Sequence, residues 1–320
     1  MPQTSTTNAG VVAGPSHSDN LYLKRFSGEV MKTFRNLTVM ASRHRVRQID
    51  SGKSAQFPAI GTAAAEYHKP GDVILGQSVA HGEKVITIDD MLISSVFVAN
   101  YEEAMNHYDV RSEYTFQQGY SMAQAYDQHL FAIATKACVN GDTGAVAGMD
   151  PATQENIGVS PTLATLTSAI FAGAAHFDTK NVPANDRFVV VPSTVYWDLI
   201  EDGSMLHRDF GNNQASQANG GQLHVAGFQV VASNNLNLNF GVATLAGKRA
   251  GATITDYTVD GTATMALLVQ KQALGTVELM HMKSEKTYQV ERQGTLMVTK
   301  KAVGHGVLKP ACLRRIAAIA

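Results

Sequence analysis

Charged side chains are scarce in this sequence. Of its 320 residues, 17% are Asp, Glu, Lys or Arg, whereas soluble domains carry roughly 25%. The formal net charge is -1 and the isoelectric point is near 6.8, so little repulsion opposes self-association and no global basic field attracts nucleic acid. Because 44% of the residues are apolar, the chain can still bury a core. We expect a folded protein with a charge-poor surface of the kind that other protein often covers.

Cysteine is also rare. Cys138 and Cys312 lie far apart and outside any CxxC or Cys/His ligand spacing, which predicts two reduced packing residues and neither a disulfide framework nor a zinc site. The N-terminus is polar and lacks the order of a signal peptide. No window approaches the roughly 18 uninterrupted apolar residues of a membrane span. We therefore expect a soluble protein made in a cytosol, with no membrane partner.

Sequence motifs of catalysis are missing as well. GxSxG, GxGxxG and HExxH do not occur, and no two histidines have helical ligand spacing. Gly52-Lys53-Ser54 matches the end of a phosphate-binding loop, but Arg47 stands at the required first glycine and Pro58 forbids the helix that should follow. Asp89 and Asp90 are adjacent, so on a strand their carboxylates point to opposite faces and cannot share one catalytic or metal site. The sequence predicts no catalytic residue, no metal and no cofactor, and therefore not an enzyme.

The N-terminal region is expected to be an arm. Its first 19 residues or so cannot repay the cost of ordering a backbone, and residues 21–47 form a partly helical amphipathic segment. Its basic residues favour a solvated face, ion pairs to another subunit, or contact with DNA. For the last two alternatives we single out Lys24, Arg25, Lys32 and Arg35.

Residues 46 to 98 have the pattern of β structure. We expect strands at 57–61, 63–67, 84–88 and 93–98, with a turn at 69–72. Before Lys84 the segment holds few large apolar residues, and an isolated two-stranded ribbon is marginal in water. We therefore expect the ribbon to lie against other protein structure and not to stand alone in water.

The strongest helical signal covers residues 110–139. Asp109 is a plausible N-cap, and Asn140-Gly141 is a left-handed stop. About 30 residues at 1.5 Å each give roughly 45 Å, so we interpret this helix as a strut. Gly119 is a candidate bend site, because glycine weakens a helix by about 1 kcal/mol relative to alanine. Close packing against a neighbouring element is the alternative explanation for Gly119.

Residues 140–160 form a polar connection, and an alternation of helix and strand follows. Ser160 as N-cap with Pro161 opens a helix whose apolar face contains Leu166, Ile170 and Phe177. A second helix is expected at 194–201 and a final closing segment at 306–316. The expected strands are 187–191, 223–225, 228–232, 263–269, 275–282 and 295–303. The fold class is α+β.

Four strings of residues resemble a known family. They are Ser42–Pro58, Glu83–Asp89, Glu102–Thr115 and Gly304–Pro310. Together they resemble the major capsid protein of short-tailed phages of the T-seven type, the autographivirus-like podoviruses. The resemblance is strong over roughly 20–140 and 270–315 and weaker between them.

The resemblance implies a Hong Kong 97-type capsid fold. It implies an N-terminal arm at 1–45, an extended ribbon (the E-loop) with a flanking peripheral strand at 46–98, and a peripheral domain with a long spine helix at 99–145. It further implies an axial domain at 146–262, peripheral strands at 263–304, and a closing segment at 305–320 that returns to the axial domain. Each part has a counterpart in the pattern described above.

The implied function is a major capsid protein that self-assembles into hexamers and pentamers of an icosahedral head shell around packaged double-stranded DNA. The resemblance also implies assembly in the bacterial host cytoplasm, maturation of a procapsid, and localisation in the virion. Besides further copies, the implied partners are a scaffolding protein, a portal protein at one vertex and DNA in non-specific contact. Lys53, Phe57 and Ile60 are the candidate subunit contacts of the ribbon. An encapsulin-like compartment shell is the alternative, and a phosphate-binding enzyme or a DNA-binding module are further alternatives.

Overall fold

The structure is a computed structural model that describes residues 38–61, 63–71, 73–74, 76–105, 110–144, 150–201, 224–240 and 255–319. The chain divides into two compact units. The described residues of the first unit lie within 93–122 and 282–300, and those of the second lie within 38–92, 123–281 and 301–319. Helix α2 (Val110–Asn140) and strands β12 (Leu274–Gln289) and β13 (Gly294–Val307) have residues in both units.

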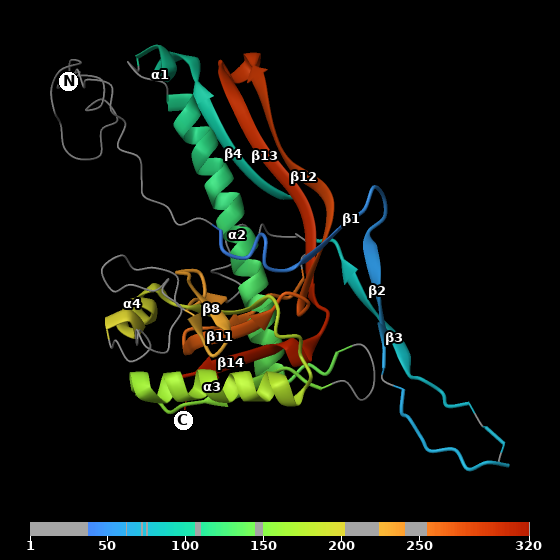
Figure 1. Ribbon diagram of the computed structural model, residues 1–320. Coiled ribbons are helices and arrows are strands. Elements are labelled where there is room, and N and C mark those ends of the chain that lie inside the picture. Colours follow the sequence, from blue (N-terminus) through green and yellow to red (C-terminus); the bar gives the residue numbers. More distant parts are fainter. Residues whose placement is uncertain are drawn as a thin grey trace, which may run out of the picture. The chain divides into compact units, whose positions relative to one another are not determined.

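The second unit contains a six-stranded sheet in the order β5-β14-β11-β6-β8-β7; Figure 1 labels its strands β8, β11 and β14. The strands are β5 (Thr153–Asn156), β6 (Arg187–Val191), β7 (His224–Val225), β8 (Phe228–Ala232), β11 (Thr264–Gln270) and β14 (Leu313–Ala317). All five residues of β6 are buried, as expected of a central strand covered on both faces. The family resemblance implied that residues 263–304 are peripheral strands, whereas β11 lies between β14 and β6 in this sheet.

Two helices pack on the six-stranded sheet. Helix α3 (Leu163–Thr179) contacts β11 and β14, and α4 (Ser193–Glu201) contacts β8. A Cβ at Gly173 would lie 2.3 Å from Cδ2 of Leu268, so a larger residue there would force the buried Leu268 side chain to move. The prediction of Ser160 as N-cap of α3 is wrong. The cap is Thr162, whose side chain accepts a hydrogen bond from the Thr165 N–H.

Helix α2 confirms the predicted long helix. It ends at Asn140, and Gly141 follows with a φ of +62°, the left-handed conformation that favours glycine. In the second unit its apolar stripe is buried in the main core, where Leu130 and Ala134 have no exposed surface. The proposed N-cap Asp109 lies outside the described residues. Among the described helices, none combines the length and apolar character of a membrane span.

The ribbon, residues 54–87, also belongs to the second unit. Strands β2 (Ser54–Ile60) and β3 (His81–Thr87) pair antiparallel, with Ser54 opposite Thr87 and Ile60 opposite His81. The Gly61 N–H donates to the Ala80 carbonyl at 2.8 Å and closes the paired region. The strand expected at 63–67 does not form, since this polar, alanine-rich stretch has no partner strand. The expected turn is present at residues 70–71.

The base of the ribbon packs on β12 and β13 through a small apolar cluster. This ribbon-base cluster contains Ala55, Phe57, Ile86, Ile88, Val277, Ala302 and Leu308. Two glycines of β13 allow the close approach. A Cβ at Gly304 would lie 2.1 Å from the Thr87 carbonyl oxygen, and one at Gly306 would lie 2.8 Å from Cγ1 of Ile86. Strand β1 (Arg45–Gln48) pairs parallel with the first part of β12. The ribbon is therefore anchored at its base.

The first unit contains β4 (Leu92–Ala99), α1 (Asn100–Met105), the first part of α2 and the hairpin that joins β12 to β13. Strand β13 lies between β4 and β12. Gln118 of α2 donates to the Met297 carbonyl at 3.0 Å and accepts from the Thr299 hydroxyl at 3.2 Å. Strands β12 and β13 are both longer than predicted. The remaining described strands, β9 (Asn239–Phe240) and β10 (Val259–Asp260), form a two-stranded pair in the second unit.

Candidate self-assembly surfaces

The distal half of the ribbon exposes large apolar side chains. Ile60 is 74% exposed, and Tyr67, Val73 and Ile74 are also exposed. Between Gly61 and Ala80 the described residues form neither helix nor strand. Large apolar side chains exposed on one segment favour an interaction site, and no described residue between Gly61 and Ala80 belongs to a buried apolar cluster. The tip of the ribbon is therefore a candidate contact for another protein surface.

The three predicted ribbon contacts do not have the same environment. Lys53 is exposed, and its carbonyl accepts a hydrogen bond from the Ile88 N–H at 2.8 Å. Phe57 is only 7% exposed because it packs in the ribbon-base cluster, and the Arg47 guanidinium lies 5.6 Å from its ring centroid. The expectation that Phe57 anchors a neighbour is corrected: it anchors its own ribbon. The side chains of Lys53 and Ile60 are exposed and can contact another subunit.

The predicted basic arm residues Lys24, Arg25, Lys32 and Arg35 lie outside the described residues. The described chain begins next to α2, where Asp127 accepts the backbone N–H of Val39 at 2.7 Å and that of Met40 at 3.2 Å. Burial raises the pKa of Asp127 to about 6, although both hydrogen bonds favour the charged form. Sequence reasoning missed Asp127. The only feature of the sequence that could have indicated Asp127 is the position of a carboxylate on the apolar side of a helix.

Three buried histidines in the second unit pack against Tyr126 or Tyr257. His44 contacts the Tyr126 hydroxyl through Nε2 at 2.8 Å, and His305 contacts the Thr276 hydroxyl through Nδ1 at 2.8 Å. His129 stacks on Tyr257 with ring centroids 4.3 Å apart. Burial lowers the pKa of all three histidines, that of His129 to about 4. These neutral rings join α2 to β12, β13 and the 38–44 segment as part of the packing.

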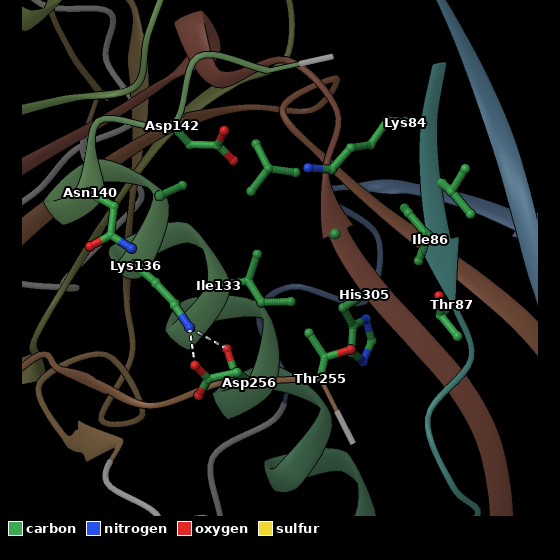
Figure 2. A pocket seen from close by; sticks show the side chains of 14 residues that line it. Lys84, Ile86, Thr87, Ile133, Lys136, Asn140, Asp142, Thr255, Asp256 and His305 are labelled. Atoms are coloured by element: carbon green, nitrogen blue, oxygen red, sulfur yellow. Dashed lines mark hydrogen bonds and ion pairs between the residues drawn. The ribbon is translucent and has the colours of Figure 1, made fainter. Parts of the chain in front are cut away.

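A cavity of about 540 Å³ lies where α2, β3, β13 and residues 255–256 meet in the second unit. Figure 2 shows the side chains that line it. The Lys136 ammonium donates to the Asp256 carboxylate at 2.6 Å and to the Asp256 carbonyl at 2.9 Å. This partner, with Thr258, lowers the pKa of Asp256. Ile133 and Val307 supply apolar walls. Within the described part of the chain, no group of three or more His, Cys, Asp or Glu residues is placed to hold a metal ion.

Gly119 lies in the part of α2 that belongs to the first unit. A Cβ at this position would meet no atom within 4 Å outside the helix backbone. Close packing against another described element is therefore not the reason for this glycine. The two cysteines, Cys138 and Cys312, are free and buried as expected, and burial raises the pKa of the Cys138 thiol to about 12.

The fold defines the class of this protein. An α+β core that carries an extended ribbon, a spine helix and a long peripheral hairpin is the Hong Kong 97-type architecture of viral shell proteins, and comparison with solved structures agrees. The chain superimposes on the capsid protein of cyanophage P-SCSP1u with a TM-score of 0.79 and 35% identity, covering 99% of each chain.

Sequence comparison gives the family. Residues 56–316 match the family model described as Gp10A-like major capsid protein. The chain is 33% identical to the major capsid protein of Escherichia phage T7 over 336 aligned positions, which cover 96% of this chain and 95% of that protein. It is 34% identical to the major capsid protein of Enterobacteria phage T3, with 95% and 93% covered. The chain belongs to the Gp10A-like major capsid proteins. It is a structural subunit of a phage head shell, not an enzyme, and it assembles with copies of itself in the virion.

Proposed function

We propose that the ribbon of each subunit lies across a neighbouring subunit and holds the shell together. The supporting observation is the exposed apolar surface of Ile60, Tyr67, Val73 and Ile74 on a segment that lacks a core. Burial of apolar area stabilises association by about 25 cal/mol per Å² before the costs of ordering are subtracted. Many such modest contacts in a closed shell reinforce one another. Lys53 adds a charged contact near the base of the ribbon.

A shortened ribbon tests this proposal. Residues 62–79 are replaced by Asn-Gly, because the Gly61–Ala80 hydrogen bond already closes the hairpin and a two-residue Asn-Gly turn fits such a closure. This change keeps Phe57 and the ribbon-base cluster intact. The variant should be soluble, with the melting temperature of the parent, yet form no shells when expressed with the scaffolding protein. Sedimentation and negative-stain microscopy measure the outcome.

A milder variant separates apolar contact from ribbon length. Tyr67→Ser, Val73→Ser and Ile74→Ser keep the full ribbon but remove its apolar surface, and shell yield should drop at least tenfold. Gln77→Ala with Ser78→Ala is the matched control on the same exposed segment and should assemble like the parent. Normal shells from the shortened ribbon would refute the proposed contact.

The same proposal extends to the other parts of the chain. Residues 1–45 act as the N-terminal arm, with Lys24, Arg25, Lys32 and Arg35 contacting a neighbouring subunit or packaged double-stranded DNA. The peripheral and axial domains build hexamers and pentamers, a scaffolding protein directs their assembly in the host cytoplasm, and a portal protein occupies one vertex. The family relationship supports these roles.

Gly119 is proposed to let α2 bend when the procapsid expands. Its support is the absence of a packing reason among the described residues, since a Cβ has free space there. Gly119→Ala should assemble into procapsids but expand more slowly, which electrophoretic mobility of the particles reports. Expansion at the parental rate would remove this role.

A further inference from the structure

A second hollow in the second unit has an unusual charge. It measures about 920 Å³ and lies between β1, the base of the ribbon and the segments around 271 and 309. Its lining includes five cationic residues, Arg45, Arg47, Lys84, Lys271 and Lys309, and one acidic residue, Asp186. Of the five, Lys84 also lines the cavity of Figure 2. We name it the basic cleft. A chain with a net charge of -1 has thus gathered cations from four separate stretches of sequence in one place.

The cations of the basic cleft outnumber its acidic residues. Arg47 donates to the Gln56 carbonyl at 2.8 Å and Lys309 to the Gln272 side chain at 2.8 Å, both neutral acceptors. None of the five makes an ion pair with a carboxylate among the residues that the structure describes. Like charges held close together repel one another, so an anionic partner in the cleft would be favourable.

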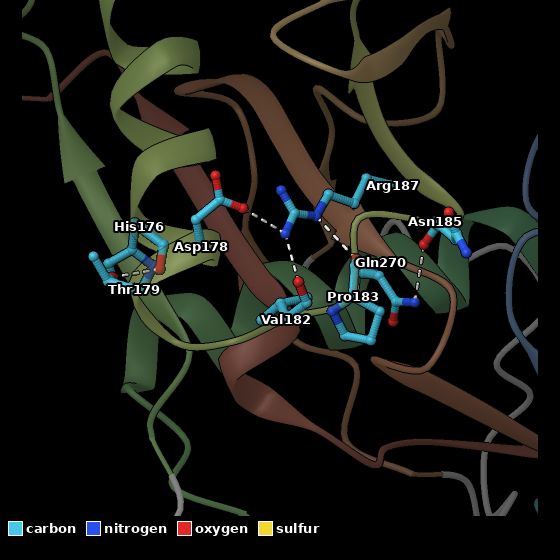
Figure 3. Close-up of polar contacts among 8 residues, drawn as sticks. All are labelled: His176, Asp178, Thr179, Val182, Pro183, Asn185, Arg187 and Gln270. Atoms are coloured by element: carbon cyan, nitrogen blue, oxygen red, sulfur yellow. Dashed lines mark hydrogen bonds and ion pairs between the residues drawn. The ribbon is translucent and has the colours of Figure 1, made fainter.

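One wall of the basic cleft is rigid. Gln270 donates to the Asn185 carbonyl at 3.2 Å, and the Lys271 N–H donates to the Asp186 carbonyl at 3.2 Å. Arg187 is buried next to them, where its guanidinium pairs with Asp178 at 2.8 Å and donates to two backbone carbonyls (Figure 3). Because these contacts hold Gln270 and Lys271 against residues 185–186, this wall of the cleft is part of the folded core.

The chemistry of the basic cleft suits an acidic protein surface. Besides its cations the cleft offers the exposed side chain of Ile60, while Phe57 and Leu308 in its lining are buried in the ribbon-base cluster. A nucleic acid backbone offers phosphates and little apolar surface to such side chains. A protein surface combines carboxylates, which arginine forks bind well, with apolar groups.

Helix α4 offers a surface of this kind. Its outward face carries Thr194, Trp197, Asp198 and Glu201 at helical spacing, while Val195, Leu199 and Ile200 are buried. Trp197 is the single tryptophan of the chain and is 58% exposed. An exposed tryptophan is typical of an interface, and the carboxylates beside it supply negative charge complementary to the basic cleft.

We propose that the basic cleft of one copy receives the acidic, aromatic face of α4 from a second copy. Within the second unit, α4 and β2 lie on opposite sides (Figure 1). Complementary surfaces on opposite sides of one subunit join copies head to tail, which closes into a ring when the rotation allows. The inference rests on self-assembly and adds a charged contact that is separate from the ribbon tip.

Charge reversal and charge exchange test the proposal. Arg45→Glu with Lys271→Glu changes two exposed side chains without a described hydrogen bond or ion pair, so the soluble chain should melt like the parent. Shell yield with the scaffolding protein should drop at least tenfold. Adding Asp198→Lys and Glu201→Lys should restore most of it, because the exchanged charges attract again. Arg45→Lys with Lys271→Arg keeps the charge and is the matched control.

Three results would overturn this assignment. Parental shell yield from Arg45→Glu with Lys271→Glu would show that the cleft makes no subunit contact. Parental yield combined with lost binding of a DNA duplex would assign the cleft to nucleic acid. Lost assembly without recovery by the α4 exchange would exclude α4 as the partner. The α4 exchange should not rescue the shortened ribbon, so failure of one contact is distinguishable from failure of the other.

Discussion

At the scale of single residues, the buried polar groups of the second unit set its response to acid. His129 stacks on Tyr257, lies 6.1 Å from the His305 ring by centroids, and is subject to the negative charge of Asp89. Lys301 lies 4.4 Å from the Tyr126 ring centroid and pairs with Glu278 at 3.2 Å. A proton added to any of the histidines would place a cation in this packed region.

His129→Phe tests the acid response, because phenylalanine keeps the stack and removes the titration. Burial lowers the pKa of His129 from 6.5 to about 4. Between these values the unfolded chain binds a proton that the folded chain does not, so stability is present above about pH 6.5 and is lost as the pH falls. From pH 7 to pH 5 the parent should lose about 2 kcal/mol through His129 alone.

Urea unfolding of the parent and His129→Phe at both pH values measures this difference. Asp127, whose pKa is raised to about 6, has the opposite effect on the pH dependence of stability. Its contribution favours the folded state at low pH and is lost as the pH rises. It is common to both proteins and cancels in the comparison. Equal loss of stability in the two proteins would contradict a neutral, buried His129.

The ribbon contacts show which residue roles the sequence could predict. Phe57 and Ile60 are three positions apart, so on a strand they face opposite sides, and both cannot anchor the same neighbour. Alternation alone could have assigned one of them to the interior. Which one is buried depends on the partners Val277, Ala302 and Leu308, which come from distant parts of the sequence.

At the scale of elements, helix and strand bounds were predicted best where a periodic apolar pattern extends over many residues. Helix α2 has about eight turns of pattern and a glycine stop, and its C-terminal limit was predicted to within one residue. Strand β12 extends to Gln289, beyond its predicted end, although residues 281–288 are exposed on both faces. These residues, which include Lys283, Glu285 and Lys286, lack alternation. Their strand conformation comes from pairing with β13, which local sequence does not reveal.

Two glycine substitutions distinguish close packing from helix preference. Gly304→Ala should destabilise the chain by about 2 kcal/mol or more, because the new Cβ would meet the Thr87 backbone and push β3 away from β13. Gly119→Ala should stabilise it by about 1 kcal/mol, since α2 offers free space there. Urea denaturation of the soluble chain measures both. A neutral Gly304→Ala would show that the base of the ribbon is loosely packed.

At the scale of the whole molecule, the proposed assembly surfaces lie mostly outside the buried apolar clusters, with which the basic cleft shares Phe57 and Leu308. Both apolar clusters found among the described residues belong entirely to the second unit. The family and the fold were predictable because residues near both ends of the chain resemble one family. The basic cleft could not be predicted from the sequence, because Arg45 and Arg47 lie near Lys271 and Lys309 only once β1 pairs with β12.

Hydrogen exchange of the unassembled chain and of the shell should map this division. Amides exchange at rates set by local opening, so strands β6, β11 and β14 should be slowest in both states. In the unassembled chain, the described residues of 93–122 and 282–300 and the ribbon tip at 63–80 should exchange faster. Assembly should slow exchange at the ribbon tip, around Lys271 and in α4, while β6 and β11 serve as internal controls. Unchanged exchange at the ribbon tip would argue against its contact with a neighbour, and unchanged exchange in α4 would argue against the cleft contact.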